Sequence, residues 1–164
     1  MNFATLFQTL EALQLSTAIR ENSWLFPLLE SIHVIAISLV FGIIALVDLR
    51  LLGVALLERT VTRLMSQLLP LAWTAFAVAL LTGSTLFASN ATAYAHNLFF
   101  RMKLVLIVAA GINMLVFHVF GCQNMQAWDA APRTPWRART AALISLSIWL
   151  SVVACGRWIG FTMI

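Results

Sequence analysis

Four long apolar segments constrain this chain more than any other feature of its sequence. They run over about residues 24–50, 68–89, 97–121 and 138–164. Each can cross a hydrocarbon core about 30 Å thick as a helix, and a helix satisfies its backbone hydrogen bonds internally. Only 10% of the residues are charged, against roughly 25% in soluble domains. The sequence therefore predicts an all-α integral membrane four-helix bundle, forming a single domain over residues 1–164.

A short amphipathic segment precedes the first apolar segment. Between residues 2 and 19, apolar side chains such as Phe3, Leu6 and Leu10 repeat at helical spacing, with polar side chains between them. We expect an N-terminal interfacial helix that lies flat on the membrane surface. The segment has no basic region ahead of a uniform apolar core, so we do not expect a cleaved signal peptide.

The basic residues indicate how the chain is oriented in the membrane. Most lie near two connecting loops: Arg50, Arg59, Arg63, Arg133, Arg137 and Arg139. Cytoplasmic loops of membrane proteins are enriched in Lys and Arg, so both loops should face the cytoplasm. The chain would then be a multi-pass protein of the bacterial inner membrane with both termini in the periplasm. The net charge of +4 reflects this topology, and we expect no nucleic-acid binding.

Ionisable residues inside the spans fall at one depth. At about 1.5 Å per residue, His33 lies roughly 13 Å below the outer end of its span, and Lys103 and Arg157 lie about 9 Å below theirs. Glu30 is one turn above His33 on the same helical face, and residues 82–83 reach a similar depth. Intramembrane charges usually face the bundle interior and mark functional sites. The spacing predicts a polar site in the outer half of the bundle.

A purely structural role for this layer remains open. Glu30 could pair with Lys103 and Arg157 between helices, while His33 donates to a neighbouring carbonyl. Lysine and arginine side chains near helix ends can also extend toward the membrane surface. Sequence alone does not choose between an ion pair and a ligand site.

A second, weaker constellation lies near the other end of the third span. His118, Cys122 and Met125 are spaced i, i+4 and i+7, and imidazole with soft sulfur ligands suits Cu(I). The chain has six methionines, so a chance match is the more economical interpretation. His118 lies some 20 Å from the depth of His33, so the two cannot share one metal or haem iron within one chain. Cys122 and Cys155 fall near opposite ends of the bundle, which argues against a disulfide between them.

The order of several motifs along the chain resembles a known superfamily. The motifs are SIHVIAISLVFG in the first span, LLTGSTLF in the second, and YAHNLFFRMKLVLIVAAGIN leading through the third. This superfamily contains the copper-resistance protein D membrane domain and the haem-binding membrane protoporphyrinogen oxidase of bacteria. The whole chain resembles more closely an uncharacterised family of small bacterial four-span proteins, which shares the interfacial helix, a DLRLLG end to the first span, and GRWI near the C-terminus.

The resemblance implies which residues belong to the functional site. It implies His33 and Lys103, and in the haem-binding relatives the span-one histidine is associated with haem. The loops and the fourth span depart from the oxidase, so the resemblance does not extend to oxidase activity.

Our leading hypothesis is a haem b-binding redox subunit. His33 would be the axial ligand, while Arg101, Lys103 and Arg157 would neutralise the propionates. The second axial position could be open, filled by Met102, or supplied by another chain in a homo-oligomer. Such a protein would pass electrons between haem and a quinone or a periplasmic redox partner.

Two other functions remain open. A membrane transport protein for copper or another small solute would use the outer layer together with His96 as its entrance, and the His118 constellation as its exit. A non-catalytic assembly subunit would need neither the outer layer nor the His118 constellation. The chain has no P-loop, no dinucleotide-binding glycine motif, no nucleophile elbow and no HExxH, so these enzyme classes are excluded.

Overall fold

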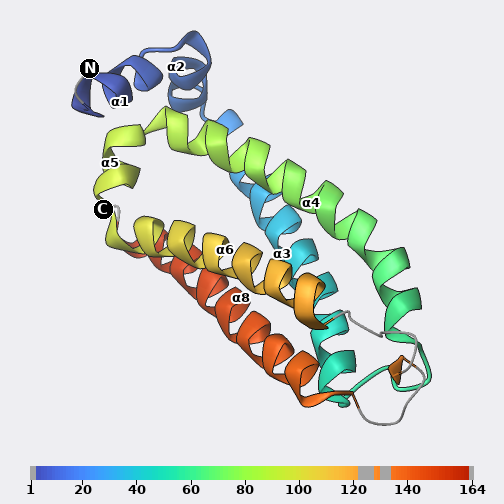
Figure 1. The fold of residues 1–164 in the computed structure, drawn as a ribbon. Coiled ribbons are helices and arrows are strands. Elements are labelled where there is room, and N and C mark those ends of the chain that lie inside the picture. The colour runs from blue at the N-terminus through green and yellow to red at the C-terminus, as the bar shows by residue number, and fades with distance from the viewer. Residues whose placement is uncertain (1–2, 122–127, 130–133, 163–164) are drawn as a thin grey trace.

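The computed structural model describes residues 3–121, 128–129 and 134–162, and these are almost entirely helical (Figure 1). Four of the helices are long and apolar enough to cross a membrane. They are α3 (Leu25–Leu52), α4 (Val61–Ser89), α6 (Leu98–Val116), which continues into the π-helical turn η1 (Phe117–Gly121), and α8 (Trp136–Thr162). The prediction of an all-α four-helix membrane bundle is confirmed.

The four membrane helices do not all pack against one another. Helix α3 contacts both α4 and α8, and α6 packs along α8, whereas α4 and α6 are not in extended contact (Figure 1). Large apolar side chains such as Leu81, 69% exposed, and Val105, 68% exposed, cover the outer faces of α4 and α6. A surface of this kind requires an apolar solvent, so the lipid bilayer is the environment of the bundle.

Three short helices lie at the end of the bundle that carries both termini (Figure 1). They are α1 (Phe3–Glu11), α2 (Gln14–Glu21) and α5 (Ala91–His96). The segment expected to form one interfacial helix over residues 2–19 is therefore two helices. Leu13 between them has an extended backbone with φ −61° and ψ 141°, which turns the chain so that α2 packs against α3 and α4.

Hydrogen bonds fasten these N-terminal helices to the bundle. Arg20 donates to the carbonyl oxygen of Ser89 at 3.1 Å, and the Glu11 carboxylate accepts from the backbone N–H of Thr92 at 2.7 Å. Ile19 is buried at the same contact. These hydrogen bonds and the buried Ile19 hold together this end of the molecule, which we call the terminal end.

The opposite end of the bundle carries Arg50, Arg59 and Arg63, and we call it the arginine end. Helix α4 begins there, earlier than its apolar sequence suggested. It begins at Val61 rather than near residue 68, because the Thr60 side chain accepts a hydrogen bond from the backbone N–H of Arg63 and caps the helix. Val61 is 1% exposed and packs in a core cluster with residues of α3 and α8. Tertiary packing thus extends α4 beyond its apolar segment.

Candidate functional site

His33 lies where α3 crosses α4. Its Nδ1 is 2.9 Å from the carbonyl oxygen of Ala79 and 3.1 Å from the Thr82 hydroxyl oxygen. The Thr82 hydroxyl itself donates to the carbonyl of Val78 at 2.7 Å. A carbonyl oxygen only accepts, so the contact with Ala79 requires the proton on Nδ1. The neutral His33 ring therefore carries its lone pair on Nε2.

Gly83 makes room for the His33 ring. A Cβ atom at this position would lie 2.8 Å from Cε1 of His33 and 3.3 Å from Nδ1. Contacts that short do not occur without displacement, and the ring is anchored to Ala79. Residues 82–83, which sequence analysis placed at the depth of His33, thus contact its ring directly.

Lys103 of α6 faces the other ring nitrogen. Its Nζ is 3.4 Å from Nε2 of His33, and the side chain is half-buried. An ammonium group only donates, so it meets the ring lone pair. A Cβ at Gly156 of α8 would lie 3.6 Å from Nζ, in ordinary contact. We call this arrangement the His–Lys pair; all four membrane helices meet at it.

Among the residues that the structure describes, no carboxylate forms an ion pair with Lys103. Glu30 is exposed on α3, so the predicted contact between Glu30 and the cations of the layer is not present here. The charge of Glu30 instead acts on Tyr94 of α5. The His–Lys pair is therefore a cationic site without an acidic partner in the described part of the chain.

The remaining residues of the predicted layer surround the pair without joining it. Arg101 and Met102 lie on the exposed side of α6. Arg157 of α8 is also exposed, and its guanidinium carbon lies 5.0 Å from the ring centroid of Phe161, in cation–π geometry. These cations are placed to act on a ligand only at the rim of the site.

Most of the predicted copper constellation lies outside the described residues. His118 is exposed within η1, while Cys122 and Met125 lie outside the described residues. Within residues 3–121, 128–129 and 134–162, no group of three or more His, Cys, Asp or Glu side chains is close enough to hold a metal ion. His96 is exposed at the end of α5.

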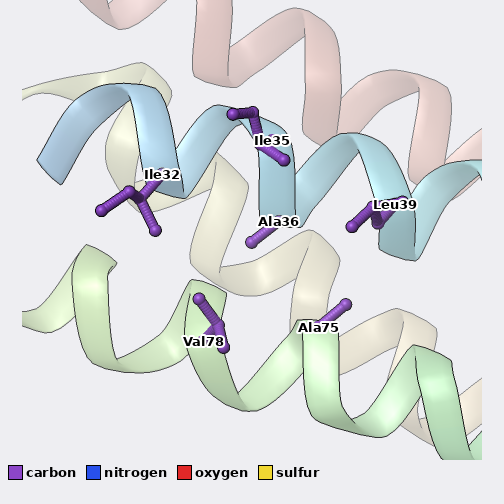
Figure 2. Close-up of a pocket in the computed structure, with 6 residues that line it drawn as sticks. All are labelled: Ile32, Ile35, Ala36, Leu39, Ala75 and Val78. Carbon is purple, nitrogen blue, oxygen red and sulfur yellow. The ribbon is translucent and has the colours of Figure 1, made fainter. Parts of the chain in front are cut away.

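An apolar recess of about 200 Å³ lies between α3 and α4. Figure 2 shows that its labelled side chains carry carbon atoms only. Among them, Ile32 immediately precedes His33 and Val78 immediately precedes Ala79. The recess offers contact area for an apolar group but no polar chemistry of its own.

Comparison with known proteins gives a family. A family profile matches residues 25–162, which contain all four membrane helices and the His–Lys pair. The chain belongs to DUF6644, a family of unknown function. Comparison with curated proteins and with solved structures finds no match. The DUF6644 match begins at α3, so the profile describes the membrane bundle and not α1 and α2.

Asp48 is a buried polar residue that sequence analysis did not single out. It belongs to the DLRLLG motif and was treated as the end of the first span. In the structure it is 6% exposed, inside α3. The signal that could have found it is its position within the predicted span 24–50, where a charged residue is costly.

A Gly83→Ala substitution tests the packing of the His33 ring. We expect it to reduce the free energy of unfolding by about 1–3 kcal/mol, because the added Cβ forces the ring off the Ala79 carbonyl. Gly42→Ala is the matched control, since a Cβ at Gly42 meets nothing within 4 Å and alanine favours the helix. Unfolding in mixed detergent micelles measures both.

A double-mutant cycle identifies the source of this cost. In a His33→Ala background, Gly83→Ala should cost little, because the ring that it displaces is gone. An equal cost in both backgrounds would contradict the proposed contact.

Tyr94 reports on the charge of Glu30. Burial, followed by the negative charge of Glu30, raises the pKa of Tyr94 above its ordinary value of 10.0. It is the only tyrosine in the chain, so phenolate absorbance measures its titration directly. Glu30→Gln should lower this pKa, and Glu58→Gln, in an exposed loop, should leave it unchanged.

The same shift predicts a pH dependence of stability. The folded state holds the Tyr94 proton more tightly than the unfolded state, so stability should fall as pH rises through the ordinary tyrosine value. A Tyr94 pKa that does not respond to Glu30→Gln would show that the two groups are not neighbours.

Proposed function

We propose that the protein is a haem b-binding membrane redox subunit, with His33 as an axial ligand. The observation that carries this proposal is the 2.9 Å contact between Nδ1 of His33 and the Ala79 carbonyl oxygen. Metal-binding histidines usually donate their second ring N–H to a carbonyl or carboxylate, which fixes the tautomer and the ring orientation. His33 has this arrangement, and Nε2 remains available for iron.

The unpaired charge of Lys103 supports the same proposal. A cation inside a membrane bundle is costly unless an anionic group balances it, and haem brings propionates. The Lys103 ammonium stands 3.4 Å from Nε2, so it must turn away when iron binds. Its flexible four-carbon stem permits this. Arg101 and Arg157, exposed near the same end of the bundle, would complete the neutralisation.

The surroundings define what the chain contributes to such a site. When bound, haem would supply one-electron redox chemistry. The residues of α3 and α4 would orient the imidazole, and the apolar recess between these helices would offer contact area for the apolar part of the group. Met102 lies on the exposed side of α6, so it would not hold the iron together with His33, and a further ligand would come from another copy of the chain or be absent.

We place this subunit in the bacterial inner membrane, with both termini in the periplasm. The arginines near the two loops at the arginine end support this orientation. A quinone in the bilayer or a periplasmic redox protein would then exchange electrons with the site. The resemblance in motif order supports the choice of cofactor, because in the haem-binding relatives the span-one histidine is associated with haem.

Haem retention tests the proposal. Protein expressed with haem supply and purified in mild detergent should show a Soret band, and His33→Ala should lose most of it because the iron loses its ligand. His96→Ala is the matched control, since His96 is exposed outside the membrane helices and should leave the band unchanged. Haem is quantified by pyridine haemochrome assay.

A third variant distinguishes the role of Lys103 from that of His33. Lys103→Gln should weaken haem retention while preserving the band position, because it removes a charge and not the iron ligand. The proposal is wrong if wild-type protein binds no haem, or if His33→Ala retains as much haem as wild type.

A further inference from the structure

A cavity of about 550 Å³ lies in the half of the bundle near the arginine end, and all four membrane helices line it. This volume falls within the roughly 300–1,000 Å³ that is typical of small-molecule sites. Trp73 of α4 and Met114 of α6 line the cavity and are 53% and 45% exposed. Its mouth therefore lies between α4 and α6, the helices that are not in extended contact (Figure 1). In a membrane this mouth faces lipid.

Asp48 supplies a buried carboxylate to the cavity wall. The Ser145 hydroxyl also lines the cavity, and Oδ2 of Asp48 has no hydrogen-bond partner among the described residues. The nearby Arg50 does not compensate it, because its guanidinium donates to the carbonyl oxygens of Arg59 at 2.7 Å and Asp129 at 3.5 Å. A carboxylate without a counter-charge inside a membrane is costly and is a mark of function.

No lysine or arginine is among the residues that line the cavity. Its wall instead holds four aromatic side chains, Trp73, Phe76, Phe117 and Trp149. The face of an aromatic ring attracts a cation, and the attraction grows where water is excluded. Carboxylate and aromatic rings together favour a positively charged ligand with apolar substituents.

We propose that this cavity binds a lipophilic organic cation, which enters from the bilayer between α4 and α6 and takes Asp48 as its counter-charge. His118 and Asn113 also line the cavity, but an anion would meet the Asp48 carboxylate with no lysine or arginine beside it. A neutral apolar molecule would give that carboxylate no counter-charge. This inference does not depend on haem binding, because the cavity and the His–Lys pair share no residue.

Binding of tetraphenylphosphonium to the full chain in lipid nanodiscs tests the proposal. Wild-type protein should bind this cation saturably, and Asp48→Asn should weaken the affinity by about tenfold or more, because it removes the counter-charge and preserves the shape. Glu58→Gln is the matched control, since Glu58 is exposed in the loop between α3 and α4 and should bind as wild type does.

Two further measurements locate the site and test its charge preference. Gly111 lines the cavity, and a Cβ there meets nothing within 4 Å, so Gly111→Leu should fill the space without disturbing the helix and should abolish binding. Neutral triphenylphosphine oxide, which has a similar shape, should bind wild type about tenfold more weakly or worse. Circular dichroism confirms that each variant is folded.

The proposal is overturned by any of three results. They are the absence of saturable binding to wild type, an unchanged affinity in Asp48→Asn or Gly111→Leu, and equal binding of the neutral analogue. The last result would identify the cavity as an apolar lipid site.

Discussion

The contact between Nδ1 of His33 and the carbonyl oxygen of Ala79 organises the polar interior of this bundle. In lipid a polar side chain has no water to bond, so it must find a partner inside the protein. Here the partner is a backbone carbonyl of a neighbouring helix, and Gly83 leaves the space that the ring needs. The position of Lys103 then follows, because its ammonium meets the nitrogen that the contact leaves unprotonated.

Lys103 and Asp48 are ionisable groups of opposite charge inside the bundle, and they do not meet. Asp48 and His33 are separated by about 22 Å along α3, at the helical rise of roughly 1.5 Å per residue. Lys103 therefore cannot neutralise Asp48, and each charge requires a partner from outside the described residues. This separation is the physical basis for assigning an anionic group to one half of the bundle and a cationic ligand to the other.

Sequence analysis predicted the fold correctly because a long apolar segment is a strong signal of a membrane-spanning helix. It also predicted that His33, Lys103 and residues 82–83 lie at a common depth, since the helical rise converts residue number into depth. It anticipated that His33 could donate to a neighbouring carbonyl, but it did not identify Ala79 as the partner, because every residue possesses a backbone carbonyl. Nor did it give the separation of Glu30 from Lys103, since depth alone does not fix how a helix is rotated in the bundle.

The other differences between the prediction and the structure arise from tertiary packing, which no local sequence pattern encodes. The break at Leu13 depends on how α2 docks against α3 and α4. Asp48 looked like the polar end of a span, but α3 continues past it to Leu52 and carries it into the interior. The mouth between α4 and α6 follows from the packing order of the helices and has no counterpart in any motif.

The protonation state of the His33 ring in a bilayer tests the central claim most directly. Lys103 is the only lysine, and replacing His96 and His118 leaves one histidine, so nitrogen labels on both residue types report on this pair alone. Solid-state NMR of the haem-free protein should show the proton on Nδ1 and dipolar contact between the lysine nitrogen and Nε2. A proton on Nε2, with a lysine nitrogen remote from the ring, would contradict the account.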